Sequence, residues 1–348
     1  NNIEKKILFP KSYHYRSSNT KDVVEGMKDL VLSSKKYFSE IKGKVVLDVG
    51  CNDGTLLTLF KKQGCKTFGI EPTGAYLEAK KKGHKIFNNY FDLTSSKLIK
   101  KRIGKIDIIT FTNVFAHIED FKNLLLSLKN ICNKETLIII ENHYFGEVVK
   151  KNQFDTFYHE HPRTYSLNSF VNISKKIGIK LIDYKFVKRY NGNIRVYFKN
   201  TGKIYKSINK INEKLKLEKK IINKVKYLQS SINHWKLNKK KQLDEIVKLN
   251  GPVAAKAFPG RASIILNLLK LDTKSISFIY EKNSSLKNNK YAPGTNIKII
   301  KEKFLLKREK QKNIIINLAW HISAEIKQYL KKKLKYHGKV IDIISQSD

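Results

Sequence analysis

Apolar and polar positions in the first part of the chain follow two alternating patterns. Short apolar runs, typical of strands buried in a parallel sheet, occur at 45–47, 67–70, 85–87, 106–111 and 136–140. Apolar residues at helical spacing predict helices over 22–41, 56–60, 76–82 and 120–132. A helix ending at Gly178 and strands at 180–188 and 193–198 complete this part. Such alternation is typical of a doubly wound α/β sheet.

The later part of the chain begins with a long polar segment and then returns to strands and helices. The Lys-rich amphipathic residues 204–249 predict a solvated connector helix or helix pair. Strands are then expected at 253–258, 275–281, 313–319 and 339–344, with helices at 263–269 and 322–336. We therefore expect an α/β protein with an N-terminal arm (1–21), a first domain (22–200), a connector (201–250) and a second domain (251–348).

The most informative stretch is the turn after the first predicted strand. Asp48 ends the strand, and Gly50 and Gly54 follow with G-x-x-x-G spacing. The next strand ends at Glu71. This is half of an open α/β sheet of the kind that holds a nucleoside-bearing cofactor. The spacing differs from the G-x-G-x-x-G of dinucleotide sites. A turn that binds no ligand is the structural alternative.

This turn resembles motif I of the class I S-adenosylmethionine-dependent methyltransferases. The resemblance implies a Rossmann-like fold with S-adenosylmethionine as cofactor. The glycine turn would pass under the methionine part, Asp48 would help to hold the turn and the amino group, and Glu71 would accept hydrogen bonds from the ribose hydroxyls. The residues implied to bind or flank the cofactor are Asp48, Gly50, Asn52, Gly54, Glu71, Asn113, Ala116 and His117.

The densest set of proton-transfer groups is the run Tyr158-His159-Glu160-His161, followed by Tyr165. Methyl transfer to carbon requires a base for the C–H proton and stabilisation of the resulting enolate. Either histidine suits the role of base, a tyrosine could donate to the enolate oxygen, and Glu160 could orient a histidine. Two alternatives stay open for the histidines: a structural pair, or a metal site, which lacks further ligands.

Several later motifs resemble the sugar C-methyltransferases, which act on nucleotide-linked keto-deoxysugars. They are Tyr-His-Glu-His with the following Tyr-Ser-Leu, the strand from Gly192 to Tyr197, the run Tyr291 to Ile297, and Ala319-Trp320 with Glu325-Ile326. The resemblance implies that His161 is the base, with Tyr158 and Glu160 as partners. It also implies a second Rossmann-like domain that closes over the sugar nucleotide. O- or N-methylation of a sugar or other small metabolite is the alternative.

The family resemblance also suggests substrate contacts and shows departures. Tyr15 and Ser18 match family residues that contact the sugar nucleotide, and Glu141, Tyr144, Tyr165 and Arg195 are further candidate substrate-binding residues. The family usually opens with a four-cysteine zinc domain, which we expect to have been lost or to lie upstream of Asn1. The glycine-rich turn of the second domain is replaced by residues 256–261, and Asn191-Gly192-Asn193 stands where Gly-Gly-Ser is commoner.

The net charge of +40 would ordinarily indicate nucleic-acid binding, but only seven of the 70 basic residues are Arg and the lysines are scattered. We expect the positive charge to favour binding of an anionic nucleotide-linked sugar. An RNA-binding protein is the weaker alternative function. Three unpatterned cysteines and the lack of an 18-residue apolar stretch suit a cytoplasmic protein without disulfides or a membrane partner. A monomer is expected, and no metal ligand set is assigned.

Overall fold

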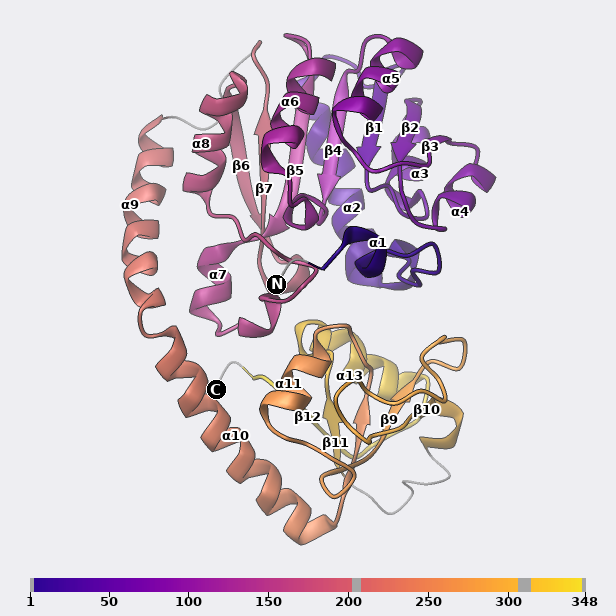
Figure 1. The fold of residues 1–348 in the computed structure, drawn as a ribbon, viewed down its shortest axis with the longest axis vertical. Coiled ribbons are helices and arrows are strands. Elements are labelled where there is room, and N and C mark those ends of the chain that lie inside the picture. Colours follow the sequence, from indigo (N-terminus) through magenta and orange to yellow (C-terminus); the bar gives the residue numbers. More distant parts are fainter. Residues whose placement is uncertain (1–2, 202–207, 306–313, 346–348) are drawn as a thin grey trace. The chain divides into compact units, whose positions relative to one another are not determined.

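The computed structural model describes residues 3–201, 208–305 and 314–345 (Figure 1). The chain forms two compact units, and each consists of two segments. Unit 1 contains Asn1–Val148 and Phe157–Asn223, and unit 2 contains Val149–Thr156 and Lys224–Asp348. The first residues of the expected arm, residues 202–207 of the expected connector, and residues 306–313 and 346–348 of the expected second domain lie outside the described ranges.

The described strands of unit 1 form a seven-stranded sheet in the order β3-β2-β1-β4-β5-β7-β6. Strand β7 runs antiparallel to both of its neighbours, β5 and β6, and the other neighbouring pairs of described strands are parallel. The carboxyl ends of β1, β2, β4 and β5 therefore meet at one edge, which is where open α/β sheets bind ligands. The strands are β1 Val45–Val49, β2 Lys66–Ile70, β3 Lys85–Phe87, β4 Ile108–Thr112, β5 Leu137–His143, β6 Leu181–Val187 and β7 Asn193–Phe198.

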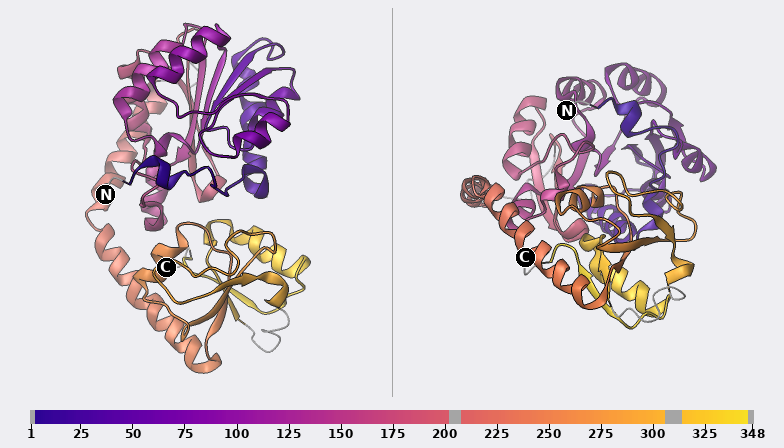
Figure 2. Two further views of the ribbon diagram at one scale, coloured as in Figure 1. Left: turned by 45° about the vertical axis from the view of Figure 1, so that its right-hand side comes forward. Right: turned by 60° about the horizontal axis from the view of Figure 1, so that its bottom comes forward.

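Helices cover both faces of this sheet because its strands are apolar on both sides (Figures 1 and 2). One core cluster joins the sheet to α5, α6 and α8, and another joins it to α2, α3 and α4. The main helices that begin in unit 1 are α1 Lys5–Leu8, α2 Lys21–Ser34, α3 Thr55–Lys61, α4 Tyr76–Lys81, α5 Leu93–Ile103, α6 Phe121–Ile131, α7 Phe145–Lys150, α8 Leu167–Ile177 and α9 Ile208–Val225. The doubly wound first domain is thus confirmed.

Unit 2 holds a five-stranded, all-parallel sheet of the order β10-β9-β8-β11-β12 among its described strands. Counted from the first strand of each unit, this is the same order as β3-β2-β1-β4-β5, so unit 2 is also Rossmann-like. Its elements are α10 Leu228–Asn250, β8 Val253–Lys256, α11 Ala262–Leu268, β9 Ile276–Glu281, β10 Ile299–Lys301, β11 Ile314–Asn317, α13 Ser323–Lys332 and β12 Lys339–Asp342.

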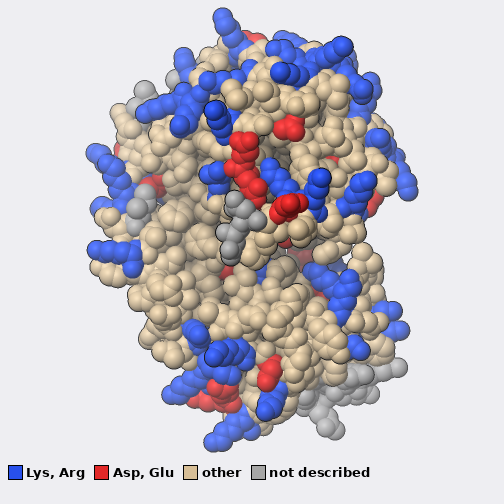
Figure 3. All heavy atoms as spheres, viewed as in Figure 1, with Lys and Arg blue, Asp and Glu red and all other residues tan. Residues whose placement is uncertain are grey.

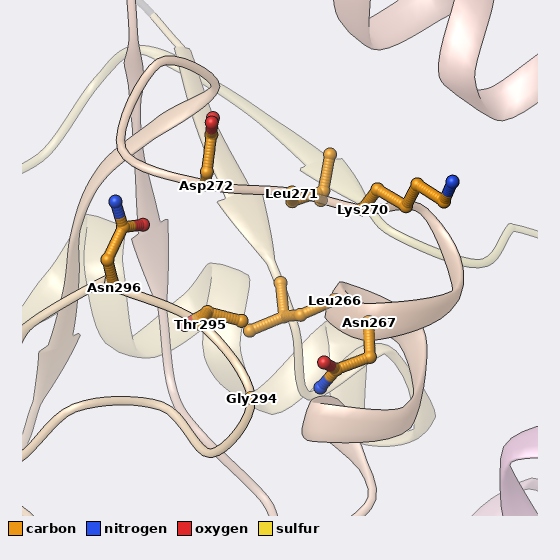
Figure 4. A pocket seen from close by; sticks show the side chains of 8 residues that line it. All are labelled: Leu266, Asn267, Lys270, Leu271, Asp272, Gly294, Thr295 and Asn296. Atoms are coloured by element: carbon orange, nitrogen blue, oxygen red, sulfur yellow. The ribbon is translucent and has the colours of Figure 1, made fainter.

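A pocket of about 570 Å³ in unit 2 lies beside the end of α11 (Figure 4). Its lining comes from the last turn of α11, the segment between α11 and β9, and the turn at 294–296. That segment precedes β9, so the pocket is at the amino end of this strand, away from the edge where sheets of this order hold their ligands.

Several element boundaries differ from the expectation. α2 ends at Ser34 rather than near 41, β5 continues to His143, and α5 and β10 were not predicted. The described part of the expected connector is a pair of helices, α9 and α10, divided between the units near Asn223. Residues 149–156, expected in the first domain, belong to unit 2 because Phe154 packs in its core against Trp235.

The charged side chains are scattered over the surface, as the sequence predicts. On the face drawn in Figure 3, Lys and Arg side chains are spread over most of the outline, with acidic side chains among them.

Across residues 3–201, 208–305 and 314–345, no helix combines the length and apolar character needed to cross a membrane.

Candidate active site

The turn after β1 packs closely against the loop after β4. Gly50 has φ 70° and Gly54 has φ 75°, in the left-handed region that glycine adopts without steric cost. A Cβ atom on Gly50 would lie 2.5 Å from Cγ2 of Val114. Asn52, between the glycines, is also left-handed, with φ 51°. The backbone of this turn can approach a ligand closely because Gly50 has no side chain.

Gly50→Ala is expected to weaken binding of S-adenosylhomocysteine about tenfold, because relieving a clash of this size costs about 1–3 kcal/mol. The added methyl group must displace Val114 or shift the turn. Isothermal titration calorimetry measures the Kd. Gly43→Ala is the matched control: Gly43 has φ 78°, but its added Cβ would meet nothing within 4 Å. Equal dissociation constants for the two variants would contradict a cofactor role for the turn.

Asp48 is buried in β1 two residues before the turn. Its side chain is 3% exposed and accepts a hydrogen bond of 2.7 Å from Oγ1 of Thr110 on β4. Burial raises the pKa of Asp48 to about 7. A nearby cation favours the ionised form of such a carboxyl group. The position and pKa of Asp48 are thus compatible with the predicted contact to a cofactor amino group.

Glu71 follows β2 directly and faces the turn after β1. Its carboxylate accepts hydrogen bonds from the backbone N of Asn52 at 2.9 Å and from N and Oγ1 of Thr73 at 2.8 and 2.6 Å. An ionised carboxylate has about four acceptor positions, so one position is left for a ribose hydroxyl. The turn and the predicted ribose acceptor are therefore connected directly.

The N-terminal arm is fixed to the same turn. Oδ1 of Asn52 accepts a hydrogen bond from N of Ser17 at 3.0 Å, and its Nδ2 donates to the carbonyl oxygen of Tyr15 at 3.1 Å. The next residue, Asp53, accepts a hydrogen bond from N of Ser18 at 3.1 Å. Tyr15 and Ser18, expected to contact the substrate, are thus brought to the turn expected to contact the cofactor.

The loop after β4 carries the other predicted cofactor residues. Asn113 has φ 54°, and its Oδ1 accepts a hydrogen bond from Asn193 at 3.0 Å. Its Nδ2 is buried and has no hydrogen-bond partner within the described ranges, so it can donate to a ligand. Ala116 and His117 follow in the short helix Phe115–His117.

The residues around the β1 turn fit S-adenosylmethionine. The close approach at Gly50, the unpaired Nδ2 of Asn113 and the carboxyl groups of Asp48 and Glu71 provide backbone access, a donor and two acceptors. These are the groups needed by an amino acid and a ribose in one ligand.

A cluster of ionisable rings surrounds His161. Its ring centroid lies 5.0 Å from that of His117, 5.4 Å from that of His143 and 4.7 Å from that of Tyr158. Burial lowers the pKa of His117, which is held by a hydrogen bond to the carbonyl oxygen of Glu160. A neutral His117 at neutral pH adds no positive charge beside His161.

Glu160 and His159 flank His161 in different environments. The Glu160 carboxylate accepts hydrogen bonds from Tyr158 at 3.2 Å and Tyr13 at 3.3 Å. His159 is exposed and lies in a turn. The turn separates the two histidines: His161 joins the ring cluster, and His159 points to solvent.

Two residues of the ring cluster were not assigned a role from the sequence, His143 and Tyr190. The His143 ring lies 5.4 Å from that of Tyr190, whose hydroxyl is 2.9 Å from that of Tyr15. Tyr190 has φ 49° and ψ 33°, which is rare for an aromatic residue and is typical of functional sites. Recognising that β5 continues to His143 would have placed this side chain at the ligand edge.

Glu141 and Arg195, which we expect to bind substrate, form a buried ion pair with each other. Nε of Arg195 lies 2.7 Å from Oε2 of Glu141, and both side chains are fully buried. The other nitrogens of Arg195 donate to Asp29, Ser33 and the carbonyl oxygen of Gly26 on α2. Burial alone would raise the pKa of Glu141, but Arg195 and Arg189 outweigh it and lower that pKa. The geometry therefore favours a role in attaching α2 to the sheet.

Tyr144 and Tyr165 are also core residues in this structure. Their side chains are 1% and 5% exposed and belong to the main core cluster of unit 1. The hydroxyl of Tyr165 donates to the carbonyl oxygen of Phe115 at 3.4 Å, and its ring stacks on Phe170. Tyr158, rather than Tyr165, is thus the tyrosine placed beside His161.

Comparisons with known proteins agree with this architecture. Residues 23–184 match the model of a methyltransferase domain, and residues 189–344 match that of the C-methyltransferase C-terminal domain. The C-methyltransferase NovU of Streptomyces niveus is 25% identical over 346 residues, covering 97% of this chain and 81% of NovU.

Solved structures with lower similarity include two methyltransferases. A SAM-dependent methyltransferase from Archaeoglobus fulgidus is 14% identical, with a TM-score of 0.41 over 51% of this chain and 94% of its own. Magnesium protoporphyrin IX methyltransferase (ChlM) from Synechocystis PCC 6803, with bound SAH, is 14% identical, with a TM-score of 0.40 over 51% of this chain and 83% of its own. With the two domain matches and the similarity to NovU along almost its whole length, the chain belongs to the S-adenosylmethionine-dependent C-methyltransferases.

Proposed function

We propose that the enzyme methylates a carbon atom of a nucleotide-linked keto-deoxysugar and that His161 is the base. The observation that carries this proposal is the position of His161 next to His117, which follows the cofactor loop after β4. A base beside the methyl donor is needed when the acceptor is a C–H group, and much less when it is an oxygen or nitrogen.

When bound, S-adenosylmethionine would supply an electrophilic methyl group, with its S–CH3 bond breaking and S-adenosylhomocysteine leaving. His161 accepts the proton from the carbon next to the sugar carbonyl, and the C–H electron pair becomes an enolate, whose carbon is the acceptor of the methyl group. Tyr158, oriented by Glu160, donates a hydrogen bond to the enolate oxygen. The chain's main contribution is to hold donor and acceptor in line.

The sugar nucleotide binds next to the N-terminal arm in this proposal. Tyr15 and Ser18 are bound to the cofactor turn through Asn52 and Asp53, which would place a sugar held by the arm beside the methyl donor. The net charge of +40 favours an anionic carrier such as a nucleoside diphosphate.

A panel of nucleotide-linked keto-deoxysugars, incubated with methyl-labelled S-adenosylmethionine in D₂O, tests the proposal. The expected product carries the label on carbon by NMR, and the acceptor carbon exchanges its hydrogen with solvent. A label attached to oxygen or nitrogen, without exchange at carbon, would overturn C-methylation in favour of the O- or N-methyltransferase alternative.

A further inference from the structure

Residues 149–156 leave unit 1 and become part of unit 2. The chain departs after Val148 and returns at Phe157, one residue before the Tyr158–His161 run. Within unit 2 the ring of Phe154 lies 4.8 Å from that of Trp235 on α10. Asp155 and Thr156 are almost completely buried. The end of the segment, residues 153–156, is thus buried in unit 2 and is not a surface loop.

Polar contacts hold the end of this segment, Asp155 and Thr156, in place. Oδ2 of Asp155 accepts a hydrogen bond of 2.8 Å from Nε1 of Trp320 and lies 3.4 Å from Nε of Arg261. Nη1 of Arg261 donates to Oγ1 of Thr156 at 3.2 Å, and its guanidinium group lies 5.2 Å from the Trp320 ring. We call these four residues the anchor.

The anchor occupies the place where a sheet of this order ordinarily holds a ligand. Arg261 comes after β8 and Trp320 comes after β11, and these strands are parallel neighbours. The sheet continues from β8 to β9 in the other direction, so their carboxyl ends form the topological switch point. In unit 2 this position is filled by the chain's own residues.

The two buried charges of the anchor, on Asp155 and Arg261, depend on each other. Asp155 is 0% exposed and Arg261 is 7% exposed. Either charge would be strongly unfavourable if it were buried alone, so the two groups are expected to dock together or not at all. Thr156 is five residues from His161, which limits the span between them to roughly 18 Å.

We call residues 157–161 the catalytic turn, and contacts within unit 1 hold its other end. The carbonyl oxygen of Glu160 accepts a hydrogen bond from His117, and Nη2 of Arg163 donates to the carbonyl oxygen of Glu119 at 2.7 Å. The short stretch containing Tyr158 and His161 therefore starts next to a residue held within unit 2 and ends at residues held within unit 1.

We propose that the anchor positions the base: Asp155, Arg261 and Trp320 hold the start of the catalytic turn so that His161 reaches the acceptor carbon. This inference rests on the proposed function of His161. The anchor residues are positioning residues, because they act through residues 157–160 and not on the substrate.

Hydrogen–deuterium exchange of peptides covering 157–161, measured on the full chain, tests the proposal directly. Arg261→Met should raise exchange there about tenfold or more and lower kcat by about 100-fold, the loss expected for a misplacement of about 1 Å. The Kd of S-adenosylhomocysteine should stay within about twofold, since the cofactor residues are untouched. Arg261→Lys should restore part of both losses, because it keeps the charge beside Asp155.

Lys256→Met is the matched control. Lys256 and Glu302 form another buried ion pair of unit 2, at 2.6 Å, away from residues 149–156. The control should destabilise unit 2 without changing exchange at 157–161 or kcat. If Arg261→Met fails to fold, Trp320→Phe removes the hydrogen bond to Asp155 but keeps an aromatic ring near Arg261, and it should shift both readouts in the same direction by a smaller factor.

The proposal is overturned if folded Arg261→Met or Trp320→Phe exchanges residues 157–161 at the wild-type rate, or exchanges them faster with an unchanged kcat. Failure of the proposed function is a separate result. It would appear in the wild-type protein, as an absence of carbon-bound label and of solvent exchange in the sugar. The exchange of residues 157–161 still decides whether the anchor holds the turn.

Discussion

Replacing His161 by asparagine is expected to lower kcat by about 10²- to 10⁴-fold, the usual contribution of a general base. Asparagine keeps a polar side chain of similar size but cannot accept the proton from the sugar carbon. Exchange of that carbon's hydrogen with D₂O should be lost in parallel with turnover. The Kd of S-adenosylhomocysteine should be nearly unchanged, so calorimetry separates a chemical defect from a loss of cofactor binding.

His159→Asn shows which histidine is the base. His159 is exposed in the same turn and takes no part in the ring contacts that are described for His161. Its substitution should change kcat by much less than that of His161. His234→Asn, on the exposed surface of α10, controls for loss of an imidazole elsewhere. Equal losses for His159 and His161, or exchange that persists in His161→Asn, would contradict the assignment.

Arg195→Met is expected to destabilise the protein by about 3–5 kcal/mol, because it leaves the buried carboxylate of Glu141 without its nearest partner. Arg189, at 3.2 Å, would be its remaining cationic neighbour among the described residues. Urea-induced unfolding of the full chain measures the change. The double variant Arg195→Met with Glu141→Leu should recover much of the loss, since it removes both charges together.

Lys185→Met provides the matched control for this prediction. Lys185 and Arg195 bind the same carboxylate, that of Asp29, but the Lys185 pair is half exposed. An exposed ion pair contributes only about 0–1 kcal/mol, so the control should unfold almost like the wild type. If Arg195→Met were equally mild but raised KM for the sugar, the original expectation of a substrate contact would be restored.

The sequence predicted the strands of the first sheet because their apolar runs are long and bounded by glycine turns. It also placed Asp48 and Glu71 correctly at the ends of neighbouring strands, since β1 and β2 are consecutive and parallel. The contacts that it did not predict are non-local. Glu141 pairs directly with Arg195 across β5 and β7, and His143 pairs with Asn193. The substrate-binding prediction for Glu141 and Arg195 was made without these cross-strand partners, which are about 50 residues away along the chain.

The remaining errors have local explanations. Helix α5 starts at a capping box formed by Asp92 and Ser95, but few of its residues are apolar, so the periodicity is weak. Nothing in the sequence of 149–156 assigns it to the second unit, and only its contacts with Trp235, Arg261 and Trp320 place it there.

The discontinuity of unit 2 also affects how the protein is synthesised. Residues 149–156 leave the ribosome well before Lys224, where the main part of that unit begins. At about 5–20 residues per second, roughly 10–40 s separate Thr156 from the last strand, β12. At the start of this interval Phe154 and the carboxylate of Asp155 have none of their native partners from unit 2, and Trp320, the last of these partners, follows Thr156 by 164 residues. The anchor can therefore form only late in translation, long after residues 157–161 have been made.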